Sequence, residues 1–110
     1  MQQALLMLTN VPDVDVARRI ARALVEQRLA ACVNILPGVE SVYQWQGAVE
    51  EATEIILLVK TVAARYAEVE AAIKALHPYD VPEVIALPVT AGLPAYMNWM
   101  EQETKNNVDL

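Results

Sequence analysis

The stretch that decides the fold runs from residue 31 to residue 61 and reads ACVNILPGVESVYQWQGAVEEATEIILLVKT. Its two ends, 31–36 and 55–59, are strongly apolar, which predicts a strand at each end. Gln46-Gly47 supplies a turn signal between them. The stretch therefore predicts a β-hairpin of about a dozen residues per arm, whereas strands typically have about 5–6 residues, so the hairpin should project beyond the body of a small domain.

Pro37-Gly38 interrupts the first arm of this hairpin. Beyond it the alternation resumes, with Val39, Ser41, Tyr43 and Trp45 on one face and Glu40, Val42, Gln44 and Gln46 on the other. We therefore interpret Pro37-Gly38 as a β-bulge or kink within one continuous strand. Two aromatic residues on one face near the tip, Tyr43 and Trp45, favour contact with another subunit.

The flanking sequence predicts the other elements from its apolar spacing. The run at 4–9 predicts a strand buried on both faces. Helices are predicted from the N-cap Asp13 to about Arg28, and from residue 62 to His77-Pro78, where proline ends the helix. Residues 82–89 predict the last strand, and residues 93–100 a short third helix. The helical stripes are Ala17, Ile20, Ala21 and Leu24, and then Val62, Tyr66, Val69, Ile73 and Leu76.

This order, β-α-β-β-α-β followed by a helix, predicts an α+β fold. It is the ferredoxin-like arrangement, in which two helices cover one face of a four-stranded antiparallel sheet. The predicted strands are apolar on both sides, so the second face of the sheet also needs a cover. Another copy of the chain is the simplest cover, and we expect a homo-oligomer.

Composition narrows the class of protein. The chain has 110 residues, 55% of them hydrophobic, and a net charge of −6, which disfavours nucleic acid as a partner. Arg18, Arg19 and Arg22 form the one basic group, which we interpret as a solvated helix face. A single cysteine excludes a disulfide within the chain. No apolar run approaches the roughly 20 residues of a membrane span, so we expect a cytoplasmic protein without a membrane partner.

Four blocks of sequence carry a resemblance to a known family. They are LAACVNILPG (29–38), SVYQWQG (41–47) with Glu50, Glu51 and Glu54, LHPYDVPE (76–83) continuing into IALPV (85–89), and Gly92 through Tyr96 and Trp99. In this order and spacing the chain resembles the CutA family of divalent-cation tolerance proteins over nearly its whole length. The resemblance implies that residues 1–110 form a single domain of that type.

The same resemblance implies a tight homotrimer built by pairing the long hairpins of neighbouring subunits. It also implies a role in tolerance of divalent cations, notably copper, with no established enzyme reaction and no organic cofactor. In a bacterial member with proposed copper ligands, cysteine and histidine occupy the positions of Leu8 and Leu76. Of that ligand set, only His77 is present in this chain.

Three residues are candidate metal ligands, each with a structural alternative. His77, the one histidine, offers an imidazole nitrogen, or it stabilises the negative end of a helix. Cys32 offers a soft thiolate for copper, or it is a small buried apolar residue. Glu54 points into an apolar strand face, so its carboxylate needs a partner. That partner is a cation, or an Arg, Lys or Tyr across a subunit interface.

Two other functions compete with metal binding. A trimer of this plan can serve as a signalling or scaffold protein that binds a small molecule in the clefts between subunits. This second hypothesis rests on analogy of fold. Catalysis is disfavoured, because the lone histidine has no serine or cysteine partner next to it in the sequence.

Overall fold

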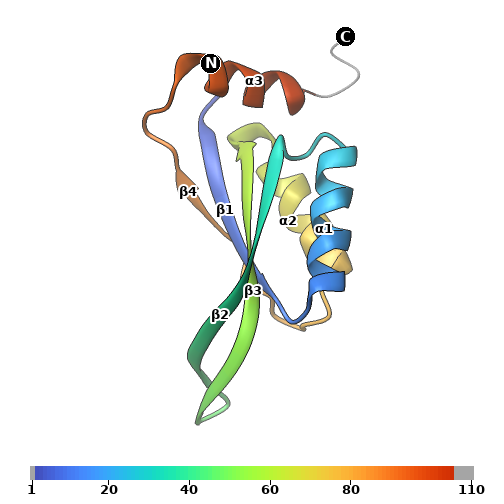
Figure 1. Ribbon diagram of the computed structural model, residues 1–110, viewed down its shortest axis with the longest axis vertical. Coiled ribbons are helices and arrows are strands. Elements are labelled where there is room, and N and C mark those ends of the chain that lie inside the picture. The colour runs from blue at the N-terminus through green and yellow to red at the C-terminus, as the bar shows by residue number, and fades with distance from the viewer. Residues whose placement is uncertain (1, 106–110) are drawn as a thin grey trace.

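The sheet carries its strands in the order β2-β3-β1-β4, all antiparallel, in a computed structural model that describes residues 2–105 (Figure 1). The strands are β1 (Ala4–Val11), β2 (Cys32–Trp45), β3 (Ala48–Val62) and β4 (Ile85–Pro88). The helices are α1 (Val14–Glu26), α2 (Tyr66–Leu76) and α3 (Pro94–Glu103), with a 3-10 turn, η1 (Ala63–Arg65), before α2. The ferredoxin-like order predicted from the sequence is confirmed.

The hydrophobic core lies between the sheet and the helices α1 and α2. Met7 and Val11 of β1 point toward these helices, and Leu57 and Val59 of β3 share that face because they pair with neighbouring β1 positions. Asp13 caps α1, since its carboxylate accepts a hydrogen bond from the Val16 N–H at 2.9 Å. The largest fully buried apolar side chains of this core are Met7, Val11, Ile20, Leu24, Leu57, Val59, Val69 and Ile73.

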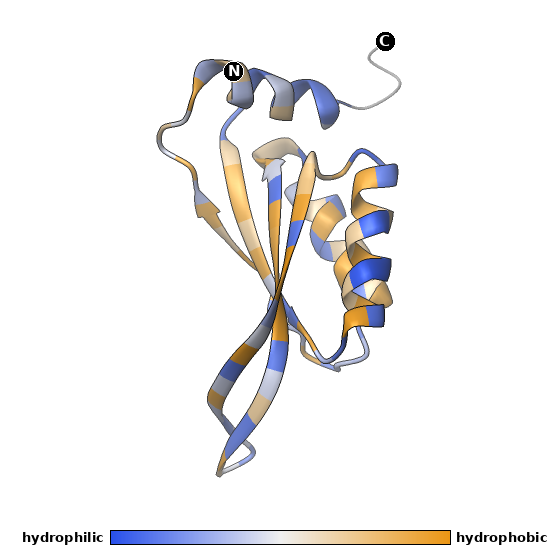
Figure 2. Ribbon diagram, in the orientation of Figure 1, coloured by the Kyte–Doolittle hydropathy of each residue, from blue (hydrophilic) through white to orange (hydrophobic). Residues whose placement is uncertain are grey.

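The opposite face of the sheet is apolar, and no helix of residues 2–105 packs across its centre (Figures 1 and 2). Leu36, Ile85 and Leu87 are each about half exposed there, at 50%, 48% and 48%. We call this surface the open face. Its apolar residues, identified from strand register, are Leu6, Leu8, Leu36, Ile56, Leu58, Ile85 and Leu87. The prediction that the strands are apolar on both sides is therefore confirmed.

The β2-β3 hairpin extends past the helical body as a free arm and gives the molecule extents of 48 × 26 × 22 Å (Figure 1). Leu36 pairs with Ile56, but Val39 pairs with Glu54, so β2 contains one extra residue between these pairs. This β-bulge contains Gly38, whose φ is +76°. It confirms the predicted interruption of the alternation.

The bulge exchanges the two faces of β2. Before it, even-numbered residues such as Leu36 lie on the open face. Beyond it, odd-numbered residues take that side, because Tyr43 pairs with Glu50 and Trp45 with Ala48, which share the face of Glu54. Both aromatic side chains therefore lie on the same side of the sheet as Glu54.

Several boundaries differ from the sequence prediction; β4, for example, begins at Ile85, three residues after its predicted start. β1 continues to Val11, two residues beyond the predicted end. β3 continues through Val62, which the helical stripe had included, so α2 begins only at Tyr66. Val62 is buried, which suits either the predicted helix or the observed strand. Its pairing with Ala4 of β1 makes it a strand residue. None of the helices within residues 2–105 is long and apolar enough to cross a membrane.

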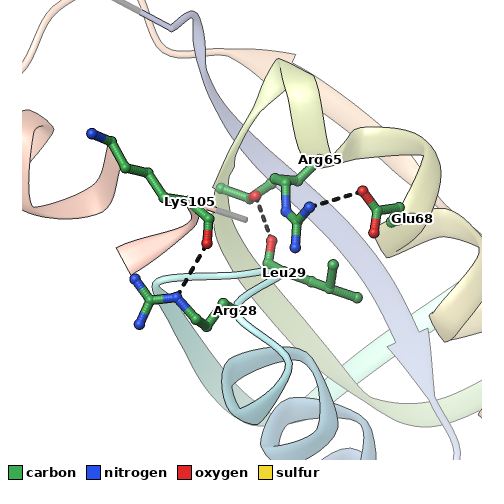
Figure 3. Close-up of polar contacts among 6 residues, drawn as sticks. Arg28, Leu29, Arg65, Glu68 and Lys105 are labelled. Carbon is green, nitrogen blue, oxygen red and sulfur yellow. Dashed lines mark hydrogen bonds and ion pairs between the residues drawn. The ribbon is translucent and has the colours of Figure 1, made fainter. Parts of the chain in front are cut away.

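The end of α1 is tied to the end of α3 through Arg28 (Figure 3). Arg28 has a φ of +59°, the left-handed conformation that glycine usually supplies after a helix. Its guanidinium donates hydrogen bonds to the carbonyl oxygens of Gln102 at 2.7 Å and Lys105 at 3.2 Å. These carbonyls lie at the end of α3, where helical partners run out. The strained backbone at Arg28 therefore accompanies a side chain that fixes α3.

Candidate functional site

A cavity of about 580 Å³ lies where the hairpin arm leaves the body of the sheet. Its walls come from the end of β1, from both strands of the arm and from the segment that joins α2 to β4. The lining residues are Asn10, Ser41, Val42, Tyr43, Trp45, Glu54, Tyr79, Asp80, Val81 and Glu83. Its volume falls within the usual range for small-ligand pockets, about 300–1,000 Å³.

Glu54 is the most deeply buried ionisable group of this cavity, with 7% of its surface exposed. The Tyr79 hydroxyl donates a hydrogen bond to Oε2 of Glu54 at 3.0 Å, and Nδ2 of Asn10 donates to Oε1 at 3.4 Å. Both donors are neutral. Neither ion pair found among residues 2–105 includes Glu54, so its carboxylate has no cationic partner there. The predicted need for a partner is met in part by the Tyr79 hydroxyl, from the same chain.

His77 joins the end of α2 to the end of β1. Its Nδ1 accepts a hydrogen bond from the Tyr79 N–H at 3.2 Å, so the ring proton resides on Nε2. Nε2 then donates to the carbonyl oxygen of Asn10 at 2.6 Å. The imidazole also packs on the Tyr79 ring, with centroids 4.6 Å apart. Both ring nitrogens are therefore engaged by the backbone.

Two groups of the cavity have perturbed acidity. Burial, followed by the hydrogen bond to Glu54, raises the pKa of Tyr79 to about 12, so its phenol remains a donor at physiological pH. Burial, followed by repulsion from Glu54, raises the pKa of Glu83 above its usual value. Oδ1 of Asn10 is buried and has no hydrogen-bond partner among the described residues. The cavity thus combines an excess of acceptors with negative charge.

The raised pKa of Glu83 predicts a dependence of stability on pH. A carboxyl whose pKa is higher in the folded chain favours folding at low pH, and this contribution is lost as the pH rises through the folded-state pKa. Glu83→Gln is therefore expected to unfold at higher urea concentration than wild type at pH 7.5. The advantage should shrink as the pH falls below the ordinary Glu value of 4.5. An advantage that grows on acidification would contradict this assignment.

Cys32 lies apart from the other two predicted ligands. It pairs with Lys60 at the far end of the sheet, six residues (60 − 54) along β3 from Glu54. At about 3.3 Å per residue, this separation is roughly 20 Å. One chain therefore brings His77 and Glu54 near each other, through Asn10 and Tyr79, but not Cys32. Residues 2–105 contain no group of three or more His, Cys, Asp or Glu side chains arranged to hold a metal.

The residues of a single chain thus do not fit a copper ion. Copper favours imidazole and thiolate ligands. Here the thiol is remote, and both imidazole nitrogens already have partners. What the chain does assemble is a neutral hydrogen-bond network around one buried carboxylate.

Sequence reasoning missed two members of this network. Asn10 directly follows the apolar run at 4–9, and a polar amide at the end of a buried strand is itself a signal for a partner. Tyr79 stands within the LHPYDVPE block, which carries the family resemblance but indicates no partner for the tyrosine. Its hydroxyl reaches Glu54 across 25 residues of sequence, a contact that no local pattern contains.

Comparison with known proteins gives a consistent picture. The CutA1 divalent ion tolerance protein model matches residues 5–103. The chain is 53% identical over 97 residues to the divalent-cation tolerance protein CutA of Thermus thermophilus, covering 88% of this chain and 94% of that one. It is 45% identical over 95 residues to protein CutA of Mus musculus, covering 86% of this chain but only about half (54%) of the mouse protein.

Solved structures agree with these sequence relatives. The T. thermophilus protein, at 50% identity, superposes with a TM-score of 0.91 and covers 93% of this chain and 99% of its own. A protein from Archaeoglobus fulgidus, described as a periplasmic divalent cation tolerance protein CutA, has 37% identity and a TM-score of 0.90, covering 93% and 99%. The match spans almost all of the described residues, and the chain belongs to the CutA1 divalent ion tolerance protein family.

Proposed function

We propose that the protein works as a homotrimer in divalent-cation tolerance, with its ligand sites next to the subunit interfaces. The observation that carries this proposal is the open face. Completing the burial of a half-exposed leucine or isoleucine contributes about 1 kcal/mol, so a face with several of them favours association. The number three and the pairing of hairpin arms come from the family resemblance.

A charge placed on the open face tests the assembly. Leu87→Glu is expected to give species near the monomer mass of 12.1 kDa at micromolar concentration, because each interface would bury an unpaired carboxylate. Val14→Glu, which adds the same charge at an exposed position at the start of α1, serves as the control and should keep three times that mass. Light scattering measures both. A trimer that survives Leu87→Glu would show that the open face is not the interface.

The metal hypothesis is retained for the assembled trimer, with Cys32, Glu54 and His77 as candidate ligands. A site that uses Cys32 needs further ligands from neighbouring subunits, and binding through His77 must displace one of its backbone hydrogen bonds. Titration with Cu(I) and Cu(II) tests this. If the double variant Cys32→Ala, His77→Ala binds copper with unchanged affinity, Cys32 and His77 are excluded as ligands.

A second candidate function is the binding of a small organic molecule, as in a signalling or scaffold trimer. The observation that favours it is the cavity around Glu54, which is lined by aromatic residues and lies beside the open face. A thermal-shift screen against metal ions and metabolites separates the two candidates. Stabilisation by metals alone supports the first, and stabilisation by organic compounds alone supports the second.

We also propose that the protein is cytoplasmic and is not an enzyme. The family is named for cation tolerance and not for a reaction. Fractionation of cells into cytoplasm and periplasm tests the location, and the periplasmic description of the A. fulgidus relative makes this worth measuring.

A further inference from the structure

The ionisable side chains that line the cavity around Glu54 are tyrosines and carboxylic acids, and no lysine, arginine or histidine among residues 2–105 lines it. The acids are Glu54, Asp80 and Glu83. Removing a carboxylate from water costs free energy that neutral donors recover only partly. Glu54 is 7% exposed and has neutral donors only. The site therefore has a strong electrostatic preference for a positively charged occupant.

Hydrogen-bonding capacity points to a ligand that donates. Each oxygen of Glu54 accepts one hydrogen bond from the protein, although a carboxylate oxygen can accept two. Oδ1 of Asn10, on the same wall, accepts none within the described residues. The Tyr79 hydroxyl already donates to Glu54. Acceptors are thus in excess, which suits a group with several N–H donors.

The walls favour an organic cation over a bare metal ion. Tyr43, Trp45 and Tyr79 contribute aromatic rings, and Val42 and Val81 contribute apolar surface. Aromatic faces attract ammonium and guanidinium groups, by about 0.5–1 kcal/mol when exposed and more when desolvated. The acids of the cavity, in contrast, do not form a cluster of three that could hold a metal ion within residues 2–105.

We infer that this cavity binds a small organic cation that carries N–H donors, a protonated amine or guanidinium, with its charge at Glu54 and its carbon skeleton between Tyr43, Trp45 and Tyr79. This inference rests on the proposed small-molecule function and specifies its ligand class. Tyr43 and Trp45 lie on the side of the carboxylate because they pair with Glu50 and Ala48, and the bulge at Gly38 bends the arm that carries them.

Two probes of matched shape test the inference on the intact oligomer at pH 7.5. Benzylammonium carries the charge and the N–H donors, and benzyl alcohol is its neutral counterpart. Calorimetry or ligand-observed NMR is expected to show at least tenfold tighter binding of benzylammonium. Raising the salt concentration should reduce that advantage, since charge attraction is screened.

Variants locate the binding. Glu54→Gln is expected to lower the affinity for benzylammonium at least tenfold and to leave benzyl alcohol unchanged. Glu83→Gln should act in the same direction with a smaller effect. Glu26→Gln removes an equal charge from the exposed surface of α1 and should change neither probe. Glu83→Gln does not change the hydrogen bonds of Glu54. If Glu54→Gln fails to fold, the effect of Glu83→Gln on benzylammonium binding still tests the inference.

The remaining outcomes overturn the inference in distinguishable ways. Equal binding of both probes would leave a small-molecule site but remove its preference for cations. Binding of Mg²⁺ at Glu54 without benzylammonium would assign the cavity to metal ions. Failure of both probes on an oligomer that light scattering shows to be intact would overturn both this inference and the small-molecule function.

Discussion

Deletion of Gly38 is expected to displace the aromatic wall of the cavity while leaving the body of the fold in place. Without the extra residue, Val39 can still pair with Glu54 and Tyr43 with Glu50, so both aromatic residues stay on the side of Glu54. The arm loses the bend and the added twist that a bulge gives a strand, and this moves the aromatic rings away from their positions over the cavity. Benzylammonium binding should fall at least tenfold. Because the arm carries little of the core, urea unfolding should change less than binding does.

Gly38→Ala is the matched control for this deletion. It keeps the residue count of β2, and an added Cβ meets no atom within 4 Å. The φ of +76° then costs about 1 kcal/mol, because alanine rarely adopts a left-handed conformation. Binding should be retained in this variant. Equal loss in Gly38→Ala and in the deletion would mean that arm rigidity, and not the bend that the bulge gives the arm, determines binding.

His77→Ala is expected to destabilise the chain by about 1–3 kcal/mol, with the same loss in the presence and absence of EDTA. The substitution removes the donor to the Asn10 carbonyl and the acceptor for the Tyr79 N–H, and leaves these partly buried groups without partners. Urea unfolding monitored by circular dichroism measures the loss. An effect that EDTA removes would assign His77 to a metal instead.

His77→Gln separates the two hydrogen bonds of the imidazole. The amide nitrogen of glutamine can reach the position of Nε2 and donate to the Asn10 carbonyl, whereas Nδ1 has no equivalent. We therefore expect it to restore part of the stability lost in His77→Ala. Stability equal to that of the alanine variant would show that the bond from the Tyr79 N–H matters more than the bond to Asn10.

Apolar spacing was sufficient to predict the element order and the interruption at Pro37-Gly38. The period of the apolar residues and the length of the segment distinguish a helix from a strand when the segment is long, as in the hairpin and in α1. They failed at Val62, which satisfies a helical stripe and a buried strand position equally well. Pairing with Ala4, a contact from the start of the chain, resolved that ambiguity, and such contacts lie outside any local window.

The candidate site was harder to predict because its groups meet through tertiary structure. Glu54 was singled out because a carboxylate within an apolar face needs a partner. Its partner Tyr79 comes from a segment without regular structure, whose path the sequence does not determine. Cys32 and Glu54 were considered together from their residue types, and only the strand register places them at different ends of the sheet.

The aromatic pair of the arm shows a related difficulty. Tyr43 and Trp45 were predicted to share a face, and they do. Which side of the sheet they face depends on whether the bulge contains an even or odd number of extra residues. A Pro-Gly pair indicates that a bulge exists but not its length.

The contact between Arg28 and the end of α3 does not depend on the side chains of Gln102 and Lys105, and it adds to the burial of Met100 against Ala4 and Ala31. Both acceptors are main-chain carbonyls, so Gln102 and Lys105 can be exchanged for other helix-compatible residues without loss of the anchor. The exposed surface of α3 is therefore free to diverge among related chains while its position stays fixed. A designer could rewrite that surface, for instance to attach a fluorophore or a peptide tag, and leave the sheet and the Glu54 cavity undisturbed.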